Sequence, residues 1–246
     1  MWLLFEPTPD GAGRYLDWII DGLGWTLGLA LGAWVIALCM GTLVGTIRTL
    51  PNGVLPRLGR VYVEIFRNIP LLVQMFFWYF VLPELLPASI GMAIKQMEPP
   101  WGSFVPALIC LGLFTSARIA EQVRAGLQAL PRGQAQAADA LGFDKGTMYR
   151  VILLPQAFRI ILPTLTNEFM TIFKNTSVAL TIGLVELTAT AREINENTFR
   201  TFEAFGVVTI IYLLIALVAW QVMHRIEQAS RLPSLSSGLA SGKARP

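Results

Sequence analysis

This sequence of 246 residues has little charge: 14% of its residues are Asp, Glu, Lys or Arg, whereas 54% are hydrophobic. Soluble domains carry nearer a quarter charged residues, so the composition argues against a water-soluble globular protein and predicts a membrane protein. The mean hydropathy of +0.57 agrees with this prediction. The net charge of +3 is too small to indicate nucleic acid as a partner.

The chain also has few residues that could hold a metal ion. Cys39 and Cys110 both lie in apolar runs, so we expect two small buried side chains rather than a disulfide or a metal pair. His224 is the single histidine, which excludes a histidine-based metal cluster. We therefore expect no metal site.

Residues for catalysis or for nucleotide binding are lacking as well. No G-x-x-x-x-G-K-[ST] loop is present, because Gly242 and Lys243 lack both the preceding pattern and the following Ser or Thr. No pair of nucleophile and base is apparent either. We expect a non-catalytic chain that binds no cofactor itself.

Long apolar runs, by contrast, are abundant. A membrane-spanning helix needs about 20 apolar residues, and five runs approach or exceed that length. The sequence therefore predicts an all-α integral membrane protein with five transmembrane helices. The predicted spans are residues 23–47, 69–86, 104–120, 160–184 and 205–223.

These spans define three parts of the chain. Residues 1–22 are an outer lead that lacks the basic region and cleavage site of a signal peptide. Residues 23–229 form the transmembrane domain. Residues 230–246 are rich in Ser and Gly, and we expect them to be a disordered tail.

The basic residues are distributed unevenly among the connecting segments. Most lie after the first and third spans and in the C-terminal tail, whereas in the segment after the fourth span four Glu outweigh two Arg. The positive-inside rule then places the N-terminus outside and the C-terminus inside. That arrangement requires an odd number of crossings, which five spans satisfy.

One polar segment, residues 130–156, lies on the predicted cytoplasmic side. Pro131 ends the preceding helix because it cannot donate a helical hydrogen bond, and Gly133 is expected to permit a turn. Residues 134–141 are good helix formers, and Gly142 is placed to end this helix in the left-handed conformation. We expect a short surface helix that is displayed to a partner.

The spacing in this segment resembles the cytoplasmic signature loop of permeases of bacterial binding-protein-dependent ABC importers. That loop reads Glu-Ala-Ala, three residues, Gly, nine residues, then Ile-x-Leu-Pro. Every gap has the right length here, with Gln136 in place of the family's Glu. The matching residues are Gln136, Ala137, Ala138, Gly142, Ile152, Leu154 and Pro155.

A second stretch, residues 61–87, resembles the second-span signature of the polar amino-acid branch of this family. Glu64 and Arg67 lie three residues apart and are positioned to pair, and Pro70 is expected to kink or restart the helix. With Gln74 they are candidate gate or structural residues. The matching residues are Glu64, Arg67, Pro70, Leu71, Gln74, Tyr79, Leu82 and Pro83.

Segments such as RNIPLLVQ and LLPQAFRIILPTLTNEF extend the resemblance to glutamate/aspartate permeases over about residues 23–187. The resemblance implies the ABC importer type I permease fold in a bacterial inner membrane. It also implies a dimer of cytoplasmic ABC ATPases that bind ATP and Mg, a second permease of the same or a related kind, and a periplasmic amino-acid-binding protein. The ATPase-coupling residues would be Gly133, Gln136, Ala137, Ala138, Leu141 and Gly142.

Polar residues within the fourth predicted span are candidates for substrate handling, because charge inside a bilayer is costly and usually functional. Thr164, Asn167, Thr171, Lys174 and Thr181 fall within an arc of about 100° on a helix. Hydrogen bonding between helices, without substrate contact, is the alternative. Glu168 lies about 100° to one side and is expected to face a neighbouring helix. The candidate path residues are Arg118, Asn167, Thr171, Lys174, Asn175 and Ser177.

Arg118 lies about 21 Å along its helix from Phe104, at 1.5 Å per residue. It could extend to the cytoplasmic surface or pair with Glu121. It could equally bind a substrate carboxylate with two parallel hydrogen bonds. Together with Lys174 it favours an anionic amino acid such as glutamate or aspartate.

The predicted function is a permease subunit that forms the path of an ATP-driven importer of acidic amino acids. An ion-coupled secondary transporter or channel subunit is the alternative. It would need its own coupling residues and usually inverted repeats, and no convincing repeat is present. A membrane-embedded enzyme would need catalytic residues that the sequence lacks.

Overall fold

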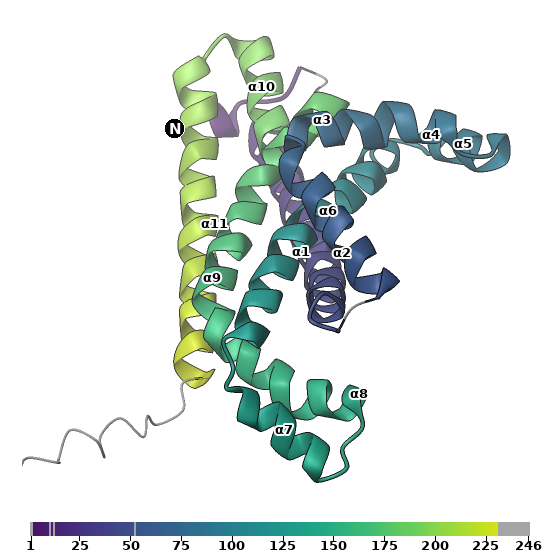
Figure 1. Cartoon of the computed structure of the whole chain (residues 1–246). Coiled ribbons are helices and arrows are strands. Elements are labelled where there is room, and N and C mark those ends of the chain that lie inside the picture. Colours follow the sequence, from purple (N-terminus) through teal and green to yellow (C-terminus); the bar gives the residue numbers. More distant parts are fainter. Residues whose placement is uncertain (1, 10, 12, 52, 231–246) are drawn as a thin grey trace, which may run out of the picture.

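The computed structural model describes residues 2–9, 11, 13–51 and 53–230. Within these ranges every regular element is a helix, apart from an isolated β-bridge between Pro7 and Arg14 (Figure 1). The predicted all-α fold is therefore confirmed. Of the predicted tail, only Ser230 is described, as the last residue of α11; residues 231–246 lie outside the described ranges.

Four long helical segments are apolar enough to cross a membrane. Two of them begin well before the predicted spans, since backbone hydrogen bonding does not stop where the apolar run begins. The helix that contains the first predicted span starts at Tyr15 rather than at residue 23. The helix that contains the fourth predicted span starts at Lys145 rather than at residue 160. The four are α1 (Tyr15–Ile47), α6 (Trp101–Gln128), Lys145–Ile182 and α11 (Thr201–Ser230).

The segment Lys145–Ile182 is a continuous helix with three changes of winding. It comprises α8 (Lys145–Thr147), the π-helical η3 (Met148–Leu153), α9 (Leu154–Asn175) and the 3-10 helix η4 (Thr176–Ile182). Its 38 residues correspond to about 57 Å of helix. The segment is therefore longer than the roughly 30 Å hydrocarbon core of a bilayer.

The second predicted span, residues 69–86, is not one straight helix. Helix α2 (Val54–Asn68) and the helical segment Leu71–Leu85 meet at an angle of 106°. Pro70 restarts the helix, as predicted, because it disfavours the helical conformation at Ile69, which is extended. The structure thus has four spans, or five if this bent pair counts as one.

Gln74 holds the bend between α2 and α3 (Leu71–Phe76). Its side chain is buried, and its Nε2 atom donates to the carbonyl oxygens of Phe66 and Ile69, both at 2.9 Å. These carbonyls are at the end of α2, where helical acceptors have no partner within the helix. Gln74 therefore acts as a structural residue of this corner.

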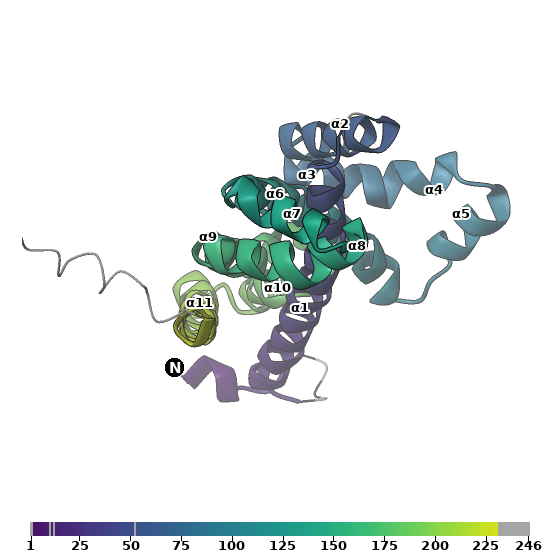
Figure 2. The ribbon, with the colours of Figure 1, turned by 60° about the horizontal axis from the view of Figure 1, so that its bottom comes forward.

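Beyond the corner the chain forms an arm that projects sideways from the body (Figures 1 and 2). The arm continues through the π-helical η2 (Phe77–Val81) and the short α4 (Leu82–Leu85) into α5 (Ala88–Lys95). An ion pair of 2.5 Å between Lys95 and Glu84 links α5 to α4.

The core of the body is the contact between α1 and α6, which depends on glycine. A Cβ atom at Gly41 would lie 2.9 Å from the carbonyl oxygen of Ser116, and one at Gly45 would lie 2.6 Å from that of Ala120. The two backbones therefore touch, as small residues allow in membrane helices. This contact fixes α6, which carries most of the polar residues described below.

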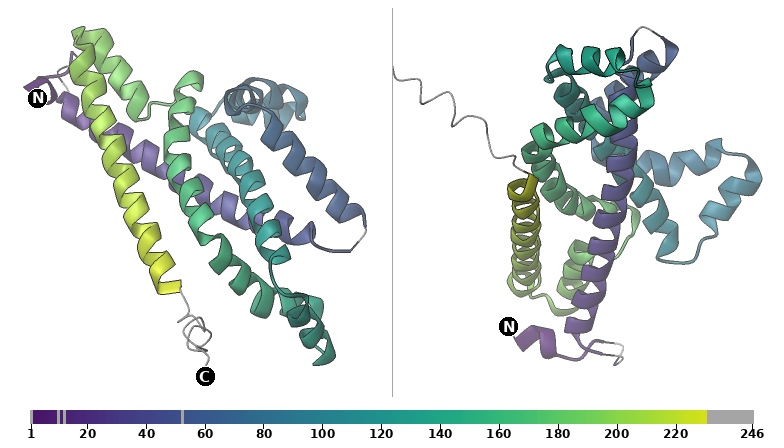
Figure 3. Two further views of the ribbon diagram at one scale, coloured as in Figure 1. Left: turned by 60° about the vertical axis from the view of Figure 1, so that its left-hand side comes forward. Right: turned by 90° about the horizontal axis from the view of Figure 1, so that it is seen from below.

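The two ends of the molecule differ in structure (Figures 1 and 3). One end holds α7 (Arg132–Ala140) and α8. The opposite end holds η1 (Trp2–Phe5) and α10 (Leu187–Thr198), which returns beside α11. There Leu3, Ile194 and Val208 share one buried cluster, so the described N-terminal segment is packed against the body.

Candidate functional site

Helix α7 lies between α6 and residues 145–153, which form α8 and η3 and lead into α9. We call residues 145–153 the stalk. Helix α7 begins at Arg132, directly after Pro131, so Gly133 lies within its first turn and does not form the predicted turn. The chain turns instead at Ala129 and Leu130, directly before Pro131, because proline is favourable at a helix start. A Cβ atom at Gly133 would meet nothing within 4 Å, so no packing requires glycine there.

The end of α7 follows the prediction. Gly142 has φ of +78°, and the N–H of Phe143 donates to the Ala138 carbonyl at 3.1 Å while that of Gly142 donates to Asp139 at 3.0 Å. This pair of bonds is a Schellman motif, which ends a helix with a left-handed residue.

The candidate coupling residues divide between two faces of α7. Gln136 and Ala137 are exposed, and Leu141 is 77% exposed. Ala138 is only 2% exposed and belongs to the same buried cluster as Met148 and Leu153 of the stalk. The expectation that Ala138 faces a partner is therefore wrong: it fixes α7 to this chain.

Two residues of this region were not predicted from the sequence. Phe143 is exposed beside Leu141 and adds an aromatic side chain to the tip; an apolar pair flanking Gly142 in a polar loop was the available signal. Asp144 caps α8 by accepting from the Thr147 amide at 3.0 Å. Hydrogen bonds from the hydroxyl and the amide of Thr147 lower the pKa of the Asp144 carboxyl.

A polar cavity of about 280 Å³ lies among α2, α6 and α9. Its walls carry two guanidinium groups, two carboxylates and one amide, which is an unusual concentration in an apolar chain. The lining residues are Arg67, Phe114, Arg118, Glu121, Gln122 and Glu168. Of the predicted path residues only Arg118 is among them, and of the predicted gate residues only Arg67.

Arg118 pairs across the cavity with Glu168. Its Nε donates to Glu168 Oε2 at 2.8 Å, and Gln122 Nε2 donates to the other carboxylate oxygen at 3.1 Å. The Glu168 side chain is 9% exposed and that of Arg118 is 44% exposed. The prediction that Glu168 faces a neighbouring helix is confirmed, whereas pairing of Arg118 with Glu121 is wrong.

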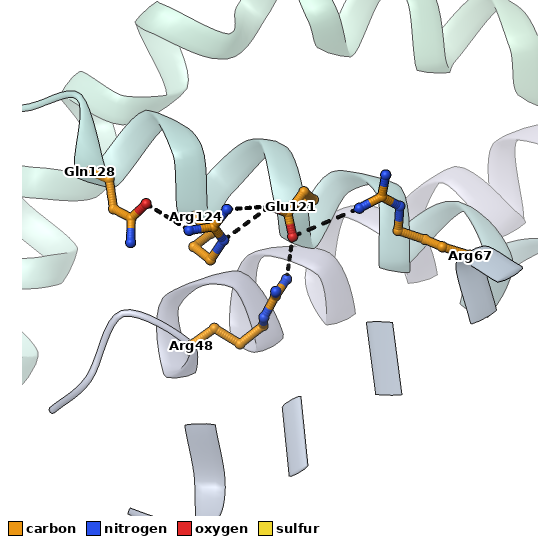
Figure 4. Close-up of polar contacts among 5 residues, drawn as sticks. All are labelled: Arg48, Arg67, Glu121, Arg124 and Gln128. Atoms are coloured by element: carbon orange, nitrogen blue, oxygen red, sulfur yellow. Dashed lines mark hydrogen bonds and ion pairs between the residues drawn. The ribbon is translucent and has the colours of Figure 1, made fainter. Parts of the chain in front are cut away.

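Glu121 is instead the centre of a second network, shown in Figure 4. Its Oε2 atom lies 2.6 Å from Arg48 Nη1 and 3.9 Å from Arg67 Nη1, and its Oε1 atom accepts from Arg124 Nε at 3.0 Å. Arg124 also donates to Gln128 at 2.6 Å. One carboxylate thus connects the end of α1, the end of α2 and the last turns of α6.

This network corrects the predicted pair of Glu64 with Arg67. Val63 of α2 is buried against Ala117 and Ala120 of α6, which directs Arg67 towards Glu121 while Glu64 stays exposed. An ion pair between residues three apart on one helix stabilises that helix by only about a few tenths of a kcal/mol. The tertiary packing of α2 on α6 decides the outcome.

The polar stripe of the fourth span lies elsewhere. Asn167 and Lys174 are exposed, whereas Thr171, Asn175 and Ser177 are partly buried along the same segment. The cavity lining does not include Lys174, so the expected grouping of Arg118 with Lys174 is absent from the described residues. The stripe is a surface feature of this chain.

The two cysteines are not equivalent. Cys110 is buried as expected, but Cys39 is exposed in a recess whose lining also includes Leu154 and Phe158. No group of three or more His, Cys, Asp or Glu side chains suited to a metal ion occurs among the described residues.

Comparison with known proteins identifies the family. The family profile described as "Binding-protein-dependent transport system inner membrane component" matches residues 19–231. The glutamate/aspartate import permease protein GltJ of Escherichia coli K12 is 45% identical over 239 residues, which cover 96% of this chain and 97% of that protein. A probable amino-acid ABC transporter permease protein, PatM of Vibrio harveyi, is 34% identical and covers 83% of this chain and 87% of that protein.

Solved structures show the same fold. A chain of an amino acid ABC transporter, crystallised with histidines, matches with a TM-score of 0.71 and 31% identity over 87% of this chain and 95% of that one. A chain of the MetNI methionine ABC transporter in an inward-facing conformation gives the same TM-score at 18% identity, over 87% of this chain and 97% of that one. From its sequence and its structure, this chain belongs to the family of inner-membrane permease components of binding-protein-dependent ABC importers.

Proposed function

We propose that this permease carries glutamate and aspartate. The observation that carries the proposal is the 45% identity with a glutamate/aspartate permease, which extends over 96% of the chain. The cavity supports an amino acid as the substrate, because its two guanidinium groups and two carboxylates suit a molecule with both an ammonium and a carboxylate group.

The cavity does not by itself select an acidic side chain. Arg118 is paired with Glu168, and Arg67 lies 3.9 Å from Glu121, so the charges of the lining balance. The Nε edge of Arg118 is occupied, but the side chain is nearly half exposed and retains further N–H groups for a substrate carboxylate. The proposal of glutamate and aspartate as substrates rests on the sequence identity with the glutamate/aspartate permease GltJ.

The proposal includes the partners and the orientation. The α7 end faces the cytoplasm and meets a dimer of ABC ATPases, which bind ATP and Mg. The η1 and α10 end faces the periplasm and meets an amino-acid-binding protein, and a second permease, identical or related, completes the path. The exposed Gln136 and Ala137 on α7, with Leu141 and Phe143 just beyond its C-terminal end, support the ATPase contact.

The fold offers a direct mechanical connection between the ATPases and the cavity. Ala138 packs α7 on the stalk, and Gln134 Nε2 donates to Gln156 Oε1 at 2.9 Å. Gln156 belongs to the continuous helix Lys145–Ile182, which also carries Glu168 of the cavity. ATP-driven movement of α7 would therefore displace this helix as a rigid body and alter the cavity.

Uptake of radiolabelled glutamate tests the substrate. The permease would be produced with its partner subunits in cells that lack their own acidic amino-acid importers. Unlabelled aspartate should compete, whereas glutamine, histidine and arginine in equal excess should not. Competition by glutamine or arginine as strong as that by aspartate would contradict the assignment. A matched strain without this permease corrects for background uptake.

A further inference from the structure

The turn between α10 and α11 displays two aromatic side chains at the outer end of the molecule. Phe199 is 89% exposed and Phe202 is 95% exposed. Phe199 is also the one non-glycine residue with positive φ, +55°, in the described part of the chain. Bulky side chains rarely adopt this left-handed conformation, because their Cβ atom crowds the backbone.

The turn is held in this conformation from both sides. The N–H of Phe199 donates to the Asn195 carbonyl at 2.8 Å, and the hydroxyl of Thr201 donates to the Asn195 side chain at 2.7 Å. Arg200 Nη1 donates to Glu6 Oε1 at 2.6 Å, which ties the turn to the N-terminal segment. A strained residue persists only where its surroundings fix it, often at functional sites.

On the α10 side the surroundings of the two phenylalanines are polar, whereas along α11 Phe202 is followed by the exposed Phe205. On α10, Arg192 and Glu196 form an exposed ion pair of 2.7 Å, and Asn197 is exposed beside them. Aromatic residues that anchor proteins at a bilayer surface are mainly Trp and Tyr. An apolar patch surrounded by charged and polar groups is typical of a protein–protein contact. On its α10 side the patch therefore fits a protein better than lipid.

A recess of about 140 Å³ lies between α1 and α10, the helix that leads into this turn. Two indoles and two carboxylates contribute to its walls, from Trp18, Trp25, Asp21 and Glu193. Within the described residues no ion-pair partner lies within 4 Å of either carboxylate. Carboxylates and aromatic faces together attract an ammonium or guanidinium group.

We propose that Phe199, Phe202 and the recess of Asp21 and Glu193 form an outer docking surface for the amino-acid-binding protein. The two phenylalanines enter an apolar hollow of that protein, and a Lys or Arg side chain of its rim enters the recess. An acidic recess attracts a basic group, so the binding protein is expected to carry a Lys or Arg side chain at this contact. This inference rests on the proposed function, which supplies a soluble periplasmic partner.

Binding measurements on the assembled importer test the surface. The complex in lipid nanodiscs would be titrated with glutamate-loaded binding protein, with affinity and stimulated ATP hydrolysis as readouts. Phe199→Gly keeps the backbone conformation, and together with Phe202→Ala it should weaken binding roughly tenfold or more, as the loss of central aromatic anchors does. Asp21→Asn with Glu193→Gln should weaken binding and reduce its dependence on salt.

Leu213→Ala is the matched control, because Leu213 is an exposed apolar residue of α11 away from the turn. It should leave binding unchanged, and all variants should keep the basal ATPase rate of the assembled complex. Unchanged affinity in both double variants would overturn the docking surface. Failure of the unmodified complex to bind the protein would instead count against the proposed function.

A spin label separates protein contact from lipid contact. Replacement of Phe199 by cysteine, in a background where Cys39 and Cys110 are Ser, permits labelling at the turn. The label should be relaxed by a water-soluble nickel chelate and should lose mobility when the binding protein is added. Preferential relaxation by oxygen, without any effect of the binding protein, would mean that the turn inserts into the bilayer and would refute the proposal.

Discussion

At the scale of single residues, the pair of Arg118 and Glu168 determines the character of the cavity. Its ionic bond of 2.8 Å joins α6 to α9, and the carboxylate is almost completely buried. A buried charge that loses its partner is costly, whereas removal of both charges often costs little. Single and double substitutions at this pair therefore have different expected effects.

Arg118→Gln should lower the free energy of unfolding by about 1–3 kcal/mol, because it leaves Glu168 with only Gln122 as a partner. The double variant Arg118→Gln with Glu168→Gln should recover most of this loss. Thermal unfolding of the purified permease in detergent measures both effects. Equal destabilisation of the single and the double variant would contradict a stabilising pair.

Uptake by the same variants decides the role of Arg118 in transport. If Arg118 binds the substrate carboxylate, the double variant should be stable but should take up glutamate poorly. Recovery of both stability and uptake would show that Arg118 serves only the ion pair. Because stability and transport are measured separately, a folding defect cannot be mistaken for a binding defect.

The partner of Arg118 could not be predicted from the sequence, although part of its surroundings could. The helical arc placed Glu168 away from the polar stripe, towards another helix, and this prediction was correct. Arg118 and Glu168 are 50 residues apart, so their contact depends on how α6 packs on α9. Two of the three arginines near Glu121, Arg48 and Arg67, come from α1 and α2, and their contacts depend on tertiary packing for the same reason.

At the scale of elements, α7 shows what local patterns can predict. Pro131 and Gly142 marked the limits of the helix closely, because proline at a helix start and glycine beyond its end act through local backbone geometry. The inward direction of Ala138 depends on contact with Met148 and Leu153 and was missed. The corner at Pro70 was predicted, but its angle of 106° was not.

Ala137→Arg should prevent ATPase binding without unfolding the permease. Ala137 is exposed on α7, so the arginine side chain would meet solvent in the free chain and the partner in the complex. Affinity purification of the tagged permease should then recover little or no ATPase subunit. Ala129→Arg, at an exposed residue just beyond α6, is the control. Normal recovery of ATPase with Ala137→Arg would refute the coupling surface.

At the scale of the whole molecule, Glu186 and the residue after it connect three helices. The Glu186 carboxylate is fully buried, accepts from the amides of Thr188 and Ala189 at the start of α10, and accepts from Tyr212 of α11 at 2.7 Å. The next amide, of Leu187, donates to Thr26 of α1. Burial raises the pKa of the Glu186 carboxyl above its ordinary value of 4.5, against the opposing effect of these hydrogen bonds.

The raised pKa predicts a pH dependence of stability. Above pH 4.5 and below the raised pKa, the folded protein binds more protons at Glu186 than the unfolded chain does, so this contribution to stability falls as the pH rises through that range. Glu186→Gln preserves an acceptor and a donor but removes the titration. The difference in melting temperature between the two proteins should therefore shift in favour of the variant as the pH rises.

Glu98→Gln is the control, because it removes the same charge from an exposed position. Melting curves in detergent between about pH 4 and pH 8 would be compared for the three proteins. A difference between the unmodified protein and Glu186→Gln that does not change with pH would contradict a raised pKa.

The bare glycine face of α1 has a consequence for biosynthesis. The chain emerges from the ribosome with α1 first, and α6 follows only after the whole arm has been made. Before α6 is inserted, Gly41 and Gly45 would therefore contact lipid instead of the backbone at Ser116 and Ala120. Until α6 is made, α1 therefore lacks the close backbone contact that stabilises it in the finished protein.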